Sequence, residues 1–162
     1  MFVRDKMEVD YAKLFDDKKM GTTVWSPLAG GILTGKYNNG IESGSRFSSG
    51  NAFLKNIYDR LFFNPAIYEK RKNALIKLSD IASAQLNCSL AQLAMAWVIY
   101  NNDVSVAITG ASQPSQLEET VKAVEISKKF TPQLLEEIEA LLETRPTAEM
   151  DWRVWGPKKC RR

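Results

Sequence analysis

The chain of 162 residues contains only two segments that predict β-strands, and this limits the possible folds more than any other feature. Residues 22–25 are β-branched and aromatic, and residues 104–109 alternate, are largely apolar and end at Gly110. The rest is mostly helical in pattern, so the order of elements is that of a parallel α/β protein. Two parallel strands cannot form a closed sheet or one covered on both faces. We therefore expect a fragment of a larger α/β domain.

Apolar residues recur at helical spacing in five stretches. We expect helices over about 9–18, 69–86 and 112–126, one that begins after Ser89 and one that begins at Pro132. Ser89 with Gln92 forms a capping-box signature, and Thr131-Pro132 is an N-cap followed by proline. Residues 28–50 hold six glycines and predict a loop without regular structure. A loop this long is usually functional.

Histidine is absent, which excludes Ser-His-Asp and Cys-His catalysis and most zinc sites. The two cysteines, Cys88 and Cys160, form neither a metal-binding spacing nor a disulfide framework, so we expect no metal and a reducing, cytoplasmic compartment. Cys88 is expected to be a small, buried, inert residue. Four glutamates of the last helix predict a solvated face: Glu136, Glu137, Glu139 and Glu143.

The net charge of +3 is mostly a property of the C-terminal end, where four basic residues lie among the last five. The rest of the chain is near neutral, so we expect no nucleic-acid partner and treat 146–162 as an irregular basic tail. No apolar run approaches the roughly 20 residues of a membrane span. The start of the sequence also lacks the apolar core of a secretory signal.

Both predicted strands are followed by residues suited to an anionic ligand. The first is followed by a glycine-rich run, with Lys36 and Arg46 further along, and the second by Gly110 and Ser112 at a helix start. Glycines let a ligand approach the backbone, helix N-termini attract phosphate, and arginine can hold it by two hydrogen bonds. These residues alone leave phosphate binding and simple helix capping equally open.

The segments TTVWSPLAGGILTGKYNNGI and VAITGASQPSQLEE, together with CSLAQLAMAW, resemble the aldo-keto reductases. The resemblance is strongest to the branch of the voltage-gated potassium channel β-subunits and extends over 1–145. It implies an (α/β)₈ (TIM) barrel that binds NADP(H), of which this chain is an incomplete C-terminal portion. The two visible strands would be the seventh and eighth, with flanking helices.

The resemblance also implies a set of cofactor-binding residues. The first strand end would line the nicotinamide and pyrophosphate, a loop with two cations would fold over the cofactor, and the second strand end would hold the adenosine. The residues are Trp25, Ser26, Pro27, Leu28, Ala29 and Gly30; Lys36 and Arg46; and Gly110, Ser112, Gln116 and Glu119.

Two positions depart from the family pattern: Thr120 replaces a usual asparagine, and Gly44 replaces a common aromatic residue. The Asp, Tyr, Lys and His or Asn that transfer hydride and proton in the family lie on early strands, so we assign no catalytic residue here. The five tyrosines are expected to serve packing or the surface: Tyr11, Tyr37, Tyr58, Tyr68 and Tyr100.

Three functions stay open. The chain is the cofactor-binding part of an NADP-dependent oxidoreductase, a regulatory module like the potassium channel β-subunits, or a truncated fragment without function. The resemblance implies a small carbonyl substrate for the complete protein and, for the second reading, a channel α-subunit and a homo-oligomer. We expect the isolated chain to be molten, self-associating or dependent on a complementing partner. The apolar stripes at Leu75, Leu78, Leu93 and Trp97 are expected to need a sheet beneath them.

Overall fold

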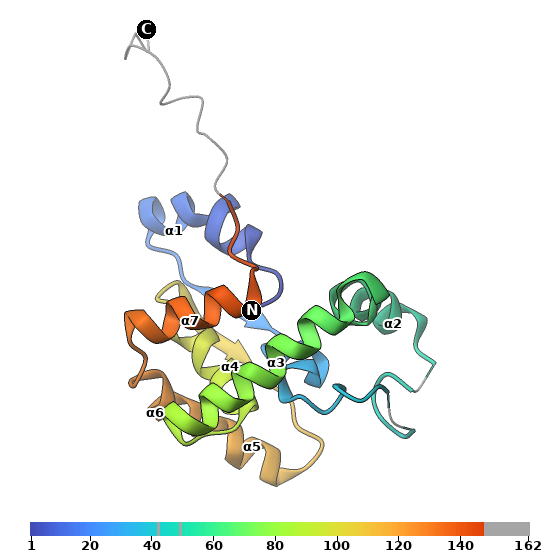
Figure 1. Cartoon of the computed structure of the whole chain (residues 1–162). Helices are drawn as coiled ribbons and strands as arrows, with labels where there is room; N and C mark the ends of the chain where they lie inside the picture. The colour runs from blue at the N-terminus through green and yellow to red at the C-terminus, as the bar shows by residue number, and fades with distance from the viewer. Residues whose placement is uncertain (42, 49, 148–162) are drawn as a thin grey trace, which may run out of the picture.

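The computed structural model describes residues 1–41, 43–48 and 50–147, and in them helices surround one two-stranded sheet (Figure 1). Three elements are short 3₁₀- or π-helical segments and carry the letter η. In chain order the elements are η1 (Lys6–Asp10), α1 (Ala12–Lys18), β1 (Thr22–Trp25), η2 (Ala29–Thr34), α2 (Ala52–Tyr58), η3 (Asp59–Phe63), α3 (Pro65–Leu86), α4 (Leu90–Tyr100), β2 (Val104–Ile108), α5 (Pro114–Val121), α6 (Ala123–Ser127) and α7 (Pro132–Leu142).

Helix starts follow local capping chemistry. Ser89 Oγ accepts from Gln92 N, while the Gln92 side chain accepts from Ser89 N, which confirms the predicted capping box of α4. Thr131 Oγ1 accepts from the backbone N–H of Leu134 and caps α7. The long helix α3 begins at Pro65 rather than near residue 69, because Asn64 caps it and proline fits the first helical turn.

Three helical predictions need correction. The segment over 9–18 contains two elements, η1 and α1, and the helix predicted over 112–126 is divided into α5 and α6 at Lys122. Near that division, Thr120 Oγ1 donates to the carbonyls of Gln116 and Leu117, a local bond that competes with regular helix geometry. Residues 52–63, for which no helix was predicted, form α2 and η3.

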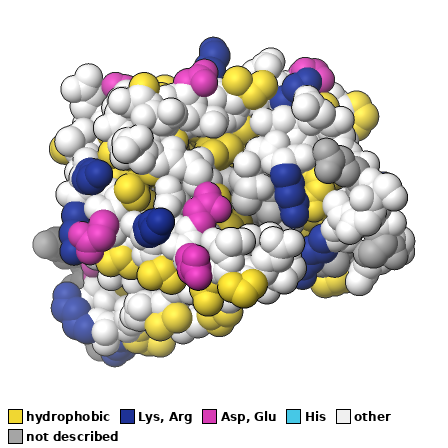
Figure 2. All heavy atoms as spheres, turned by 90° about the horizontal axis from the view of Figure 1, so that it is seen from below, with side chains coloured by type: hydrophobic (Ala, Val, Ile, Leu, Met, Phe, Trp, Pro, Cys, Tyr) yellow, Lys and Arg dark blue, Asp and Glu magenta, His cyan; other side chains and the backbone are white. Residues whose placement is uncertain are grey.

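The two strands are parallel, as predicted, and Trp25 lies opposite Ile108 at their carboxyl ends. Helix α4 packs against β2 on one side of the sheet. The other face is uncovered: Trp25 is 72 % exposed, and Val106 and Ile108 are 51 % and 53 % exposed. Apolar side chains also lie between charged ones on the surface seen from below, the side on which α5 lies (Figure 2). The sheet is therefore open, as expected for part of a barrel.

The buried core is built mainly by helices. Leu75 and Leu78 of α3, Leu93 of α4 and Ile138 of α7 are fully buried, and α3 packs against both α4 and α7. The expected sheet does lie against α4, which carries Leu93, whereas α3, which carries Leu75 and Leu78, packs against α4 and α7. Exposed apolar side chains lie on the sheet and on α5, and also elsewhere, as at Phe53 of α2, which is 72 % exposed.

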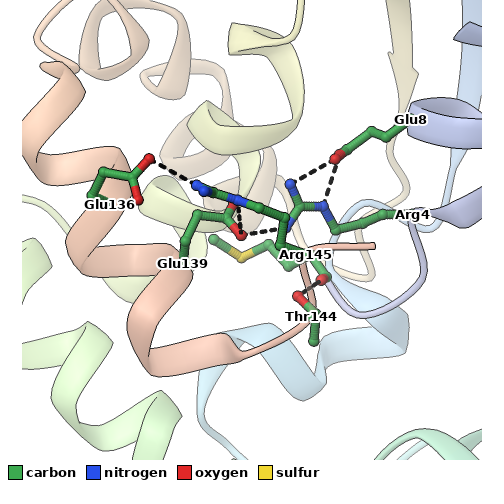
Figure 3. A network of polar contacts seen from close by, with 7 residues as sticks. Arg4, Glu8, Glu136, Glu139, Thr144 and Arg145 are labelled. Atoms are coloured by element: carbon green, nitrogen blue, oxygen red, sulfur yellow. Dashed lines mark hydrogen bonds and ion pairs between the residues drawn. The ribbon is translucent and has the colours of Figure 1, made fainter. Parts of the chain in front are cut away.

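A buried ion-pair network joins the start of the described chain to its last helix (Figure 3). Arg4 donates to both carboxylate oxygens of Glu8 and to Glu139 Oε2, and its guanidinium lies 4.8 Å from the centre of the Trp97 ring. Burial works to lower the pKa of Arg4, but the hydrogen bonds to the two glutamates outweigh it and raise the pKa. Glu139 corrects the prediction of a solvated glutamate face, since its side chain is only 9 % exposed.

The polar contacts continue to the end of the described chain. Thr144 Oγ1 donates to the carbonyl of Met1 at 2.7 Å, and Arg145 pairs with Glu136 and Glu139. Among the described helices, none is both long enough and apolar enough to cross a membrane. The tail predicted over 146–162 falls almost entirely outside the described residues, and so do Cys160 and the two tryptophans at 152 and 155.

Candidate functional site

Two glycine-containing loops leave the same end of the sheet. Because β1 and β2 are parallel and Trp25 faces Ile108 in the register, the chain after each strand emerges at one edge. The residues predicted from the first loop, Trp25 to Gly30, and Gly110 with Ser112 of the second therefore begin side by side. In parallel α/β proteins this carboxyl edge is where ligands bind.

The first loop coils tightly at once after the strand. Ser26 and Ala29 have positive φ angles of 52° and 49°, followed by Gly30 at 66° and Gly31 at 99°. Non-glycine residues in this region carry strain of the kind that is found at functional sites. The coil continues as the 3₁₀ segment η2. The prediction that residues 28–50 have no regular structure is therefore wrong over Ala29–Thr34.

Positive φ favours glycine at Gly30 and Gly31, and close aromatic rings add to this requirement at Gly30. A Cβ at Gly31 would lie 2.7 Å from Cε of Lys36, so the lysine side chain crosses directly over the glycine backbone. The Lys36 Nζ lies 4.9 Å from the centre of the Tyr37 ring. The structure thus brings one predicted cation, Lys36, onto the predicted glycine loop.

An aromatic cluster attaches the rest of the long loop to the same place. A Cβ at Gly30 would lie 2.9 Å from Cζ of Phe47 and 3.0 Å from Cζ of Tyr58. The Phe47 ring packs against Tyr37 at 4.8 Å and against Tyr58 at 4.7 Å between ring centres. Phe47 is buried and directly follows Arg46, so the backbone at Arg46 is held close to the glycine loop. A supporting role for Phe47 and Tyr58 was not predicted from the sequence.

The second loop is more open. A Cβ at Gly110 would meet nothing within 4 Å, which leaves this backbone accessible to a ligand. Ser112 donates to Gln116 Oε1 through its backbone N–H at 3.0 Å and through its hydroxyl at 3.2 Å. Gln116 therefore orders the turn before α5, and the structure brings Ser112 and Gln116 together.

Glu119 faces another helix start. Its carboxylate accepts from the Ser89 hydroxyl, and its backbone carbonyl accepts from the Gln92 side chain. These bonds hold α5 against the first turn of α4. The side chain of Glu119, like those of Ser112 and Gln116, thus already has a structural partner, whereas Gly110 keeps its backbone open.

Other reactive side chains have structural environments. Burial raises the pKa of the Cys88 thiol, with Lys129 opposing weakly, so an inert cysteine fits this position. Tyr37 and Tyr58 are buried among aromatic rings, and the Tyr68 hydroxyl donates to the carbonyl of Asn38 at 2.9 Å. The Tyr37 hydroxyl is buried without a hydrogen-bond partner among the described residues. Across 1–147, where described, no three metal-ligating side chains gather.

The fold and its strand-end loops can now be compared with known proteins. A model described as "Aldo/keto reductase family" matches residues 2–143, so the chain belongs to the aldo/keto reductase family. Helices around an open pair of parallel strands are consistent with part of the barrel that this family implies.

Two relatives carry the same name, "Probable voltage-gated potassium channel subunit beta". The protein from Arabidopsis thaliana is 39 % identical over 154 residues, and the one from Oryza sativa subsp. japonica is 38 % identical over 154 residues. In both cases the match covers 94 % of this chain and 44 % of the relative. The chain therefore spans less than half the length of these curated relatives.

Proposed function

We propose that the chain is the NADP(H)-binding C-terminal portion of an aldo/keto reductase, in which β1 and β2 serve as the seventh and eighth barrel strands. The observation that carries this proposal is the common edge shared by the two glycine loops, with Lys36 lying over Gly31. A dinucleotide needs close backbone approach and positive charge for its phosphates, and this edge offers both. Membership of the aldo/keto reductase family supports the same reading.

The residues present fit such a cofactor. Gly110 leaves backbone open, the exposed Trp25 ring offers a flat surface at the strand end, and the buried Tyr37 hydroxyl beside the first loop lacks a protein partner. When bound, NADPH supplies a hydride. The chain's own residues would bind and orient it: the loop from Trp25 to Gly30 along the nicotinamide and pyrophosphate, and Lys36 with Arg46 at the phosphates.

The second loop would hold the adenosine end of the cofactor. Gly110 and Ser112 would meet it through the backbone, with Gln116 fixing the turn. Glu119 would act mainly by holding α5 in place, because its carboxylate already accepts from Ser89. We assign no catalytic residue to the chain and propose that proton donation to a small carbonyl substrate needs groups outside it.

Cofactor binding by the purified chain tests the proposal. Titration of NADPH and NADH by calorimetry should give tighter binding of NADPH, because the 2′-phosphate meets the cations. Arg46→Ala should weaken NADPH binding by about 1–3 kcal/mol and leave NADH nearly unchanged. Lys77→Ala, which removes an exposed lysine of α3, is the matched control. Equal losses for both cofactors would reject the 2′-phosphate assignment, and no NADPH binding would reject the function.

Activity gives a second test. The chain should not oxidise NADPH with a small aldehyde above background, because no residue of this chain is assigned the proton-donating role that the family's reaction needs. Steady turnover by the purified chain would contradict this part of the proposal.

The alternative is a cytoplasmic regulatory module that binds a channel α-subunit as a homo-oligomer. The name that both relatives carry favours this second function. Co-purification of the chain with a potassium channel α-subunit, retained after Arg46→Ala, would support this second function independently of cofactor binding.

A further inference from the structure

Each of the two cations in the loop after β1 is followed directly by a buried aromatic residue. Lys36 precedes Tyr37, and Arg46 precedes Phe47. The two cations are exposed, whereas the Tyr37 and Phe47 side chains are only 1 % and 7 % exposed. Burial of each ring therefore fixes the backbone from which the neighbouring cation extends.

The two rings contact each other. The ring centres of Tyr37 and Phe47 lie 4.8 Å apart, with the ring planes tilted by 53°. Phe63 packs edge-on against both rings, at 5.9 Å from Tyr37 and 5.7 Å from Phe47. Aromatic pairs are favourable at separations of about 4.5–7 Å in tilted and edge-on arrangements. The ring contacts therefore join two segments of the loop that lie ten positions apart in the sequence.

The same rings lie against parts of the candidate site. Lys36 Nζ is 4.9 Å from the centre of the Tyr37 ring, within the range of a cation–π contact. Phe47 lies so close to Gly30 that a Cβ at this glycine would come within 2.9 Å of the Phe47 Cζ. One ring thus holds a cation directly, and the other holds the segment of Arg46 against the glycine loop.

The segment that carries Arg46 enters the core at one residue. Of the residues between 38 and 50 that the structure describes, Phe47 alone is buried. Gly40 and Gly44 have positive φ angles, and a Cβ at either position would meet nothing within 4 Å. Glycines make alternative backbone conformations accessible, so the position of the Arg46 backbone depends strongly on the Phe47 contact.

We propose that the Tyr37–Phe47 ring pair sets the separation between Lys36 and Arg46, and that Phe47 is the positioning residue through which the site prefers NADPH to NADH. This inference rests on the proposed function. Holding two cations in place before binding lowers the cost of ordering them around a ligand with several phosphates. The 2′-phosphate distinguishes the two cofactors, so a displaced Arg46 weakens NADPH binding more than NADH binding.

Calorimetric titration of the full chain with NADPH and with NADH tests the proposal. Phe47→Leu keeps an apolar side chain but removes the ring, and should lower the ratio of NADPH to NADH affinity by about fivefold or more. Tyr58→Leu removes another ring that packs on Phe47, at 4.7 Å, and should act in the same direction. Phe130→Leu is the matched control and should keep the ratio, because Phe130 is similarly buried, at 9 % exposed, and packs on Tyr100.

A double variant separates positioning from a general loss of structure. In the Arg46→Ala background, Phe47→Leu should leave the affinity ratio unchanged, because the side chain that Phe47 positions is absent. Far-ultraviolet circular dichroism reports whether each variant is folded, and Tyr58→Leu keeps the test decisive if Phe47→Leu does not fold.

The possible results distinguish this inference from the proposed function. Equal weakening of both cofactors by the ring variants, or a further fall of the ratio in the Arg46→Ala background, overturns the role of Phe47. A preference for NADPH that survives both ring variants rejects this inference alone. Absence of NADPH binding by the unaltered chain rejects the proposed function and this inference together.

Discussion

At the scale of single residues, position 30 requires glycine because its backbone has a positive φ and because the Phe47 ring lies close to it. Gly30→Ala would force alanine into a left-handed conformation and place its Cβ 2.9 Å from the Phe47 ring. Gly44→Ala has the same backbone cost, with nothing within 4 Å, and is the control. Chemical denaturation should show that Gly30→Ala loses about 1–3 kcal/mol more unfolding free energy than Gly44→Ala. Equal losses would mean that the Phe47 contact is unimportant.

The buried partner of Arg4 gives a second prediction at this scale. Glu139→Gln removes the charge opposite a guanidinium that stays buried, so it should lower the unfolding free energy by about 3 kcal/mol. Glu136→Gln removes an exposed partner of Arg145 and should cost less than about 1 kcal/mol. Urea denaturation of both variants at neutral pH measures the difference. Comparable small losses would show that the Arg4 network contributes little.

These residues differ in how far sequence alone could predict them. The strand-end loops and Lys36 were predicted as a site because glycine and cation patterns are local. The burial of Glu139 was not, because its partner Arg4 lies 135 positions away and the helix pattern around Glu139 is that of a solvated face. Phe47 and Tyr58 were missed for the same reason, since nothing nearby in sequence indicates that they pack on Gly30.

At the scale of elements, the start of α4 is held twice. Ser89 caps its own helix and also donates to Glu119 of α5, whereas Thr131 caps only α7. Thr131→Ala should cost about 1 kcal/mol, and Ser89→Ala should cost about 1 kcal/mol more, because a bond to a carboxylate is lost as well. Thermal unfolding followed by circular dichroism measures both. If Ser89→Ala cost no more than Thr131→Ala, the hydrogen bond between Ser89 and Glu119 would not contribute to the unfolding free energy.

The elements were predicted best where their signals are local. The caps of α4 and α7 and both strands agree with the sequence patterns, because a cap needs only four neighbouring residues. The division between α5 and α6 and the helical turns over 52–63 were not predicted. The helical turns over 52–63 depend on neighbours that are distant in sequence, such as the aromatic rings around Phe63, whereas the division between α5 and α6 lies beside the local bond of Thr120.

At the scale of the whole molecule, the helix core and the sheet differ in how well they are covered. Leu75, Leu78 and Leu93 are fully buried, while Val106 and Ile108 stay exposed on the uncovered face of the sheet. The buried core argues against a molten chain, and the apolar face of the sheet favours self-association. Self-association of the isolated chain therefore stays a prediction.

Sedimentation equilibrium should detect this association as a mass that rises with concentration. Val106→Lys with Ile108→Lys should raise the dissociation constant by at least about tenfold, because each side chain loses apolar burial. Ile76→Lys, on an exposed position of α3, is the control and should leave the association unchanged. A monomer at all concentrations, or an equal effect of the control, would contradict a role for the open face.

The Arg4 network has a consequence for the order of events during synthesis on the ribosome. During synthesis on the ribosome, Glu139 is added 135 positions after Arg4. Until then the guanidinium has only Glu8 as a partner and must stay in water, because burying it without Glu139 is costly. The segment before β1 therefore docks only after α7 has emerged. Closing so long a loop makes this docking a late step of folding.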